Sequence, residues 1–161
     1  MTDFSVLLDM MSNKIVRLLI LILVCQGAGL VGSIFTFESI STWYSTLQKP
    51  FFNPPNYIFG PVWTLLYTMM GISLFLVWGK KKANLKWFWA QLALNTLWSI
   101  VFFGLRNPSA ALVVIIFLWI SILKTIISFK KVNEISSYLL YPYLAWVTFA
   151  SILNLAIMLL N

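Results

Sequence analysis

The sequence has 161 residues, of which 61% are hydrophobic and only 9% are charged, whereas about a quarter of the residues in a soluble protein are charged. Several apolar runs reach the roughly 18 to 20 residues that cross a bilayer as a helix, and they lack the strict alternation of a membrane β-barrel. The net charge of +7 comes from basic residues beside these runs, which favours contact with the lipid bilayer and argues against nucleic-acid binding.

The sequence therefore predicts an all-α fold, a single transmembrane domain over residues 1–161. Helices are expected, in chain order, at about residues 15–37, 58–78, 87–105, 109–129 and 137–160. The connectors between the last four of these helices are short, which predicts that sequential helices pack as antiparallel neighbours. The first connector, residues 38–57, is long, contains Pro54-Pro55 and is rich in aromatic residues. We expect it to form a packed lid over one end of the bundle.

The basic residues are distributed unequally between the two ends of the expected bundle. Only Lys49 and Arg106 fall on the side of the long loop, and the other nine of the 11 basic residues fall on the side of the N-terminus. This bias places the N-terminus in the cytoplasm and the C-terminus outside. No Arg-rich amphipathic transit peptide precedes the first helix, so the expected host is a prokaryotic plasma membrane.

The residue types available exclude several kinds of chemistry. The chain has no histidine, and its four acidic residues fall in the N-terminal tail or in connectors, so no general acid or base is expected at membrane depth. Cys25 is the only cysteine, which leaves no metal cluster or intramolecular disulfide. We therefore expect neither a metal site nor a resident cofactor.

Uncharged polar and aromatic residues follow helical spacing on two of the expected helices. Polar amides in hydrocarbon need partners, so we expect both faces to point inward, toward each other or toward a ligand. Trp63 lies near the start of the second helix, and we expect it to face the same space. Structural pairing between helices is the alternative. The two faces are Gln91, Asn95, Trp98 and Ser99, and Tyr143, Trp146, Ala150 and Asn154.

Two other patterns have simpler explanations. Trp78, Trp87 and Trp89 flank the basic loop between the second and third helices, as expected of an interfacial tryptophan belt. In the first helix, small residues at positions 28 and 32, and at 29 and 33, allow close approach of another helix. They fit packing within the bundle at least as well as a homodimer.

Three ordered segments resemble the TspO/MBR family, the tryptophan-rich sensory proteins and translocator proteins. They are WYSTLQKPFFNPPNYIFGPVWTLLYTMMG at residues 43–71, QLALNTLWSIVFF at 91–103 and YPYLAWVTFASILN at 141–154. The sequence departs from the family pattern at Phe52, because the family has a tryptophan at this position of the loop. The C-terminal cholesterol motif is absent from residues 155–161, so sterol binding by that motif is not expected.

The resemblance implies a five-helix bundle, often a homodimer, with a cavity that opens toward the long-loop side and binds porphyrins. Family ligand positions correspond to Tyr44, Pro54, Trp63, Asn95, Trp146 and Ala150 in this chain. Their expected neighbours at the ligand site are Tyr67, Trp98, Ser99 and Asn154.

The function predicted from these features is a membrane receptor for flat hydrophobic ligands, porphyrin-like tetrapyrroles above all, that senses or regulates their level. Protoporphyrin or haem would be its ligand, with Trp63 and Trp146 stacked on the ring and Asn95 at a polar edge. One alternative is a transporter of such ligands. Another is an enzyme-like, light-dependent degradation of porphyrin, in which Trp63 and Trp146 would act as electron donors.

Overall fold

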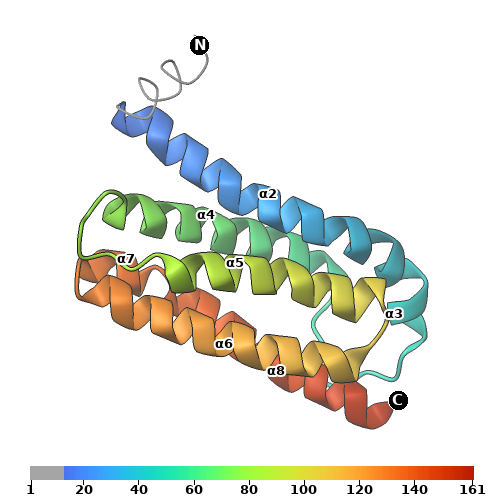
Figure 1. The fold of residues 1–161 in the computed structure, drawn as a ribbon. Helices are drawn as coiled ribbons and strands as arrows, with labels where there is room; N and C mark the ends of the chain where they lie inside the picture. Colours follow the sequence, from blue (N-terminus) through green and yellow to red (C-terminus); the bar gives the residue numbers. More distant parts are fainter. Residues whose placement is uncertain (1–12) are drawn as a thin grey trace.

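The computed structural model describes residues 13–161, and it is helical almost throughout this range, with no strand (Figure 1). The long helices are α2 (Lys14–Ser41), α4 (Phe59–Val77), α5 (Lys86–Ser99), α6 (Pro108–Lys130) and α8 (Tyr141–Leu160). Shorter elements connect or extend them: α3 (Trp43–Thr46), η1 (Asn56–Ile58), η2 (Ile100–Gly104) and α7 (Glu134–Tyr138).

Four segments of the described chain are long and apolar enough to cross a membrane: Lys14–Ser41, Asn56–Val77, Pro108–Lys130 and Glu134–Leu160. The fifth expected span is present as α5, which continues without a break into η2. The predicted all-α membrane bundle is therefore confirmed.

Two helices end differently from the prediction. The first extends to Ser41 because its polar end is held in place: the Ser39 hydroxyl donates a hydrogen bond of 2.7 Å to the carbonyl of Phe103. The last expected helix begins earlier, at Glu134, and is interrupted after Tyr138. Pro142 explains this break, since it has no amide hydrogen to continue the helix and its ring crowds the carbonyl four residues before it.

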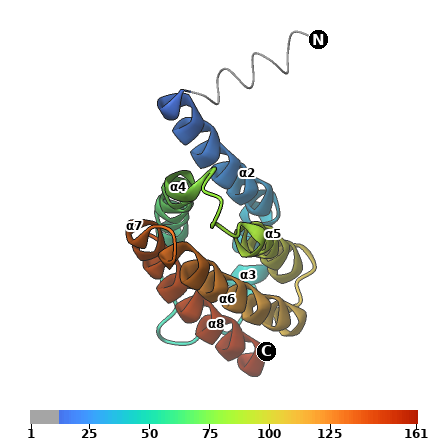
Figure 2. The same cartoon turned by 60° about the vertical axis from the view of Figure 1, so that its left-hand side comes forward.

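The neighbour relations differ from the prediction at one place. α2 packs against both α4 and α5, and α6 packs against α5 and α8, while α7 contacts α4 and α6 (Figure 2). Consecutive helices α4 and α5 do not pack along each other, so the expectation that they are direct neighbours is wrong. Their connector spans eight residues, 78–85, which is enough extended chain to bridge a wide gap.

The end of α5 widens into a π-helical turn before the chain reverses. The amide of Leu105 donates to the carbonyl of Ile100 over 2.8 Å, five residues back, which is the π-helical pattern. Arg106 then adopts a positive φ of 52° and ends the helix. The Asn107 side chain caps the next helix by accepting from the amide of Ala110.

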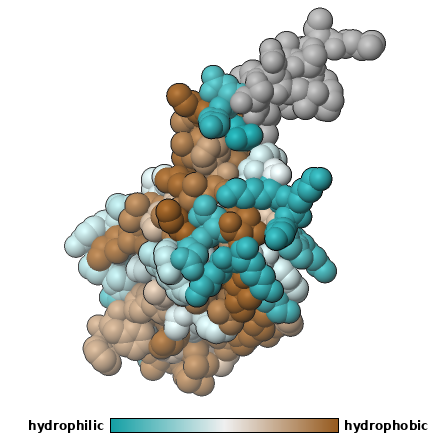
Figure 3. Space-filling model, turned by 90° about the vertical axis from the view of Figure 1, so that its left-hand side faces the viewer, coloured by the Kyte–Doolittle hydropathy of each residue, from teal (hydrophilic) through white to brown (hydrophobic). Residues whose placement is uncertain are grey.

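The two ends of the bundle differ in polarity. The start of α2, the α4–α5 connector and the α6–α7 connector lie at one end, and α3 and the C-terminus lie at the other (Figure 1). Most of the lysines belong to the first end, and Figure 3 shows the hydrophilic side chains gathered there. The basic asymmetry predicted from sequence is therefore a property of the folded bundle.

Close helix contacts depend on small residues inside the bundle. A Cβ atom added at Gly71 of α4 would lie 2.5 Å from the Cα atom of Ile22 on α2. Gly29 and Gly32 of α2 make similar approaches to Tyr67 and Ser99, so these small residues serve packing within the bundle. The hydroxyls of Ser73 and Ser136 each donate 2.7 Å to the other residue's carbonyl, joining α4 to α7.

We predict that Gly71→Ala destabilises the bundle, because the new methyl group meets the backbone of α2 and forces the two helices apart. Overpacking of this kind typically costs about 1 to 3 kcal/mol. Reversible unfolding by sodium dodecyl sulfate in mixed micelles, followed by circular dichroism, measures the change. The matched control is Gly27→Ala, since a Cβ atom there has no neighbour within 4 Å. Equal stability of the two variants would show that α2 and α4 are farther apart.

Candidate ligand-binding cavity

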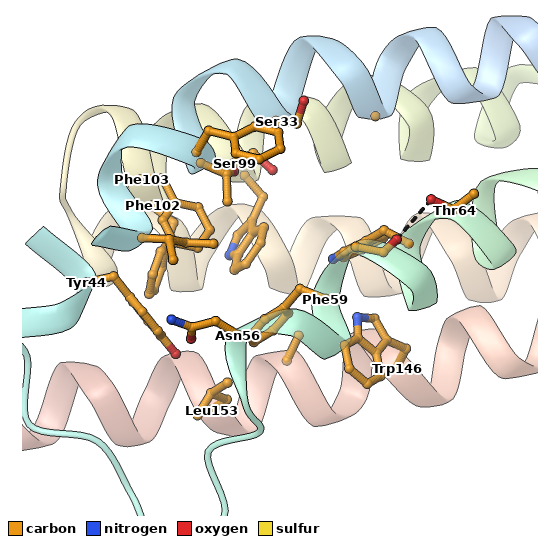
Figure 4. Close-up of a pocket in the computed structure, with 18 of the residues that line it drawn as sticks. Ser33, Tyr44, Asn56, Phe59, Thr64, Ser99, Phe102, Phe103, Trp146 and Leu153 are labelled. Atoms are coloured by element: carbon orange, nitrogen blue, oxygen red, sulfur yellow. Dashed lines mark hydrogen bonds between the residues drawn. The ribbon is translucent and has the colours of Figure 1, made fainter. Parts of the chain in front are cut away.

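A cavity of about 490 Å³ lies in the half of the bundle next to α3 (Figure 4). This volume is within the range of small-molecule sites. Four long helices, η2 and the loop before α4 contribute to its wall. The lining residues include Gln26, Gly29, Ser33, Thr36, Ile40, Tyr44, Asn56, Phe59, Trp63, Thr64, Tyr67, Trp98, Ser99, Phe102, Phe103, Trp146, Phe149, Ala150, Leu153 and Asn154.

Aromatic rings form much of the wall and hold one another in place. Trp98 stacks on Phe102 with ring centroids 5.2 Å apart, and Trp63 lies 5.6 Å from Tyr67. On the side of α8, Trp146 is 6.1 Å from Phe59, edge to face. Rings fixed by such contacts offer flat surfaces to a planar guest at little cost in side-chain entropy.

Two buried amides position the aromatic wall. The oxygen of Asn154 accepts from the indole nitrogen of Trp98 at 3.1 Å, and its nitrogen donates to the carbonyl of Pro108 at 2.8 Å. Asn95 is 1% exposed and donates 3.0 Å to the hydroxyl oxygen of Tyr67. Because Tyr67 accepts this bond, its hydroxyl proton is left to donate into the cavity.

Most of the residues expected at the site from sequence lie on the cavity wall: Tyr44, Trp63, Tyr67, Trp98, Ser99, Trp146, Ala150 and Asn154. Pro54 and Asn95 do not line the cavity. Pro54 belongs to the lid, where its carbonyl accepts from Asn53. Asn95 lies behind Tyr67 and reaches the cavity only through it.

The structure adds one whole helix to the site. Gln26, Gly29, Ser33, Thr36 and Ile40 of α2 line the cavity at helical spacing. This helical spacing could have indicated from the sequence that one face of α2 lines the cavity. The signal is weak, because the other faces of this helix are also strongly apolar. Gln26 also joins α2 to α4, because its amide donates to the Thr64 carbonyl at 2.9 Å and to the Thr68 hydroxyl at 3.0 Å.

Phe102 and Phe103 were also missed as site residues. They follow each other in the chain, so regular helical geometry would not have been expected to bring both to one cavity. Both belong to the π-helical turn η2 and line the cavity, with their ring centroids 4.8 Å apart. π-Helical turns are frequent at functional sites, but no sequence pattern indicated this one.

Tyr143 and Gln91, expected on the inward faces, are buried but do not line the cavity. The ring centroids of Tyr143 and Trp63 are 6.2 Å apart, in an edge-to-face arrangement. Neither the Tyr143 hydroxyl nor the Gln91 amide has a hydrogen-bonding partner in the described part of the chain. The polar interior of the bundle therefore continues beyond the wall formed by Trp63.

The long loop is partly a packed lid. The Tyr44 hydroxyl donates 2.6 Å to the side chain of Asn53, and the Phe52 ring lies 6.3 Å from Phe149 of α8. Not all of its aromatic residues pack, since Phe51 is 100% and Tyr57 77% exposed. Burial raises the pKa of the Tyr44 hydroxyl to about 12, so this group stays a neutral hydrogen-bond donor.

The C-terminus fastens the outer part of the lid. The side chain of Asn161 accepts from the amide of Gln48 at 3.0 Å and donates to the Gln48 carbonyl at 3.1 Å. The pair resembles a short β-bridge, but it is exposed to solvent. Exposed hydrogen bonds exchange readily with water, so the segment around Gln48 can open without disrupting the helices.

The cavity wall has no ionised side chain among its described residues. Its polar groups are hydroxyls, amides and indole nitrogens, several of which already have protein partners. Such a wall can bind a flat, largely apolar molecule by stacking and orient it with a few hydrogen bonds.

Comparison with known proteins agrees with this geometry. The TspO/MBR family model matches residues 21–160. The chain is 49% identical to the tryptophan-rich protein TspO of Archaeoglobus fulgidus over 92% of this chain and 99% of that protein. It is 39% identical to the human translocator protein, over 77% of this chain and 78% of that protein.

A bacterial relative has a name that refers to sensing. The tryptophan-rich sensory protein of Cereibacter sphaeroides is 38% identical over 74% of this chain and 77% of its own length. The family match covers all the residues that line the cavity. On the sequence match, the apolar helices and the aromatic cavity together, this chain is an integral membrane protein that belongs to the TspO/MBR family.

Proposed function

We propose that this protein binds and senses porphyrin-like tetrapyrroles, with protoporphyrin or haem as the bound ligand. The observation that carries the proposal is an uncharged cavity of about 490 Å³ that has Trp63, Trp98 and Trp146 in its wall. The planar macrocycle of a tetrapyrrole would be stabilised by stacking on indole rings that are held in fixed positions. Membership of a family that includes proteins named for sensing supports the same function.

In this proposal Trp63 and Trp146 stack against the macrocycle. Tyr67 donates to a polar edge, while Asn95 acts as a positioning residue that holds the Tyr67 hydroxyl at 3.0 Å. This arrangement replaces the direct contact to Asn95 expected from sequence. Ala150 lies one helical turn after Trp146, and its small side chain leaves room for a ring beside the indole.

The proposed membrane is a prokaryotic plasma membrane, with the N-terminus in the cytoplasm and the C-terminus outside. Basic side chains at one end of the bundle support this orientation. It places α3 and the lid outside the cytoplasm, so that ligand enters from that side.

Trp146→Phe and Trp63→Phe should weaken protoporphyrin binding by roughly two- to tenfold, the equivalent of the 0.5 to 1.5 kcal/mol typical of one aromatic pair. Quenching of intrinsic fluorescence during titration of the purified protein measures the affinity. Trp87→Phe is the control, because it makes the same substitution at a tryptophan that does not line the cavity. The proposed site would be wrong if the control weakened binding as much as the other two.

Ligand binding should slow hydrogen exchange in residues 45–57, since a guest beneath the lid holds Tyr44 and Asn56 against the cavity. Mass spectrometry after deuterium labelling, with and without protoporphyrin, measures this protection. The connector of residues 78–85 is the internal control because it lies at the other end of the bundle. Unchanged exchange in the lid, in a sample shown to contain bound ligand, would exclude a lid function.

A reporter that fluoresces only in the cytoplasm should be silent when fused after Asn161, if the C-terminus lies outside. The same reporter inserted between Lys81 and Lys82 should fluoresce, since that connector lies at the basic end. Comparing the two fusions in cells, at matched expression, tests the orientation. The opposite pattern would reverse it.

A further inference from the structure

A second hollow lies at the basic end of the bundle, away from the aromatic cavity. It is an open groove of about 420 Å³ between the α4–α5 connector, the start of α5 and the end of α6. Its lining residues are Lys82, Asn84, Trp87, Lys124, Ile127, Ser128 and Lys131. Neither of the acidic residues in the described part of the chain, Glu38 and Glu134, lines it.

Positive charges are held together in this groove without a negative side chain between them. The Lys124 ammonium lies 4.2 Å from the ring centroid of Trp87, and the Lys86 ammonium lies 5.4 Å from the same centroid. Both distances are within the range of cation–π attraction. Lys86 lies beside the groove and is not part of its lining, which contains Lys82, Lys124 and Lys131. These three like charges repel one another, so an anion bound between them would stabilise the arrangement.

The groove is built by hydrogen bonds as well as by charge. The Asn84 side chain accepts a hydrogen bond of 3.0 Å from the amide of Lys86, the first residue of α5. The hydroxyl of Ser128 on α6 donates to the Asn84 carbonyl at 3.3 Å. The connector that carries Lys82 is therefore tied to α6, which carries Lys124 and Lys131.

An apolar stripe on α6 leads away from the groove into the membrane. Val113, Phe117, Ile120 and Ile127 are exposed at alternating spacings of three and four residues, and Lys124 falls on the same stripe. The stem of Lys124 can lie along this stripe while its ammonium reaches the level of Lys82 and Lys131 at the end of the bundle. A phosphate at that level would contact these ammonium groups, and acyl chains would cover the apolar residues of the stripe.

We infer that this groove binds the phosphate headgroup of an anionic phospholipid, with its acyl chains along the exposed face of α6. The shared chemistry is a phosphate group, which a soluble phosphate compound could also supply. The apolar stripe beside the groove favours the lipid, because one phospholipid can place its phosphate on the groove lysines and its acyl chains on the stripe. Trp87 then has a specific contact in addition to its expected interfacial position.

The test uses the full-length protein, stripped of lipid in a neutral detergent and titrated with phosphatidylglycerol. Native mass spectrometry counts bound lipid and gives an apparent affinity. The groove variant carries Lys82→Gln, Lys124→Gln and Lys131→Gln. The control carries Lys14→Gln, Lys80→Gln and Lys81→Gln, which removes the same charge from the same end but leaves the groove lining intact.

We expect the groove variant to bind phosphatidylglycerol at least about tenfold more weakly, because it loses the three ammonium groups of the groove lining that would contact the phosphate. The control should change by less than about threefold, and wild-type protein should prefer phosphatidylglycerol to phosphatidylcholine. Circular dichroism should be the same for all three proteins, because the substituted lysines are exposed.

Equal losses in the two variants would overturn the inference, because binding would then follow the total charge of this end and not the groove. The same holds if wild-type protein binds phosphatidylcholine as tightly as phosphatidylglycerol. Displacement of the lipid by millimolar inorganic phosphate or glycerophosphoglycerol would show a soluble phosphate site, and the lipid assignment would fail. No displacement, together with loss in the groove variant alone, supports it.

Discussion

The side chain of Asn154 joins three parts of the bundle on which the cavity depends. From α8 it accepts from the indole of Trp98 on α5 and donates to the carbonyl of Pro108 at the start of α6. In hydrocarbon no water competes for these groups, so breaking either bond leaves a buried polar atom without a partner. Asn154 therefore fixes the angle of Trp98, on which Phe102 stacks in turn.

The need of buried polar atoms for hydrogen-bonding partners also explains why few polar groups in the cavity wall are left without a protein partner. Tyr67 is oriented by Asn95, and Gln26 is used to join α2 to α4. What remains for a ligand is a wall of fixed rings with a small number of hydroxyl donors. Such a site distinguishes guests mainly by shape and by flatness, because it offers no charge to select among them.

The two ends of the bundle differ in the interactions that they contain. At the lid end, aromatic contacts and the Asn161–Gln48 pair hold the loop against α8, and the cavity wall has no ionised group among its described residues. At the basic end, the Lys124 ammonium lies 4.2 Å from the ring centroid of Trp87. The uncharged cavity is thus kept apart from the basic end of the bundle.

The sequence alone determined the class of the protein and much of its site. Long apolar runs required membrane helices, and the spacing of Trp146 and Ala150 placed both on an inward face, where they line the cavity. The basic asymmetry could also be derived from the sequence, because lysines are excluded from hydrocarbon and must gather at helix ends. These features follow from helical periodicity and from the cost of charge in lipid, both of which are local.

Only the tertiary structure decided which helices meet and at what distance. Periodicity places Asn95 and Asn154 on inward faces, but it does not show that Asn95 lies behind Tyr67 or that Asn154 holds Trp98. Nor does it show that α2 packs against both α4 and α5 and supplies a wall of the cavity. An apolar helix looks alike on all sides in sequence, and its position is set by small residues such as Gly71, whose close contact exists only once the helices have packed.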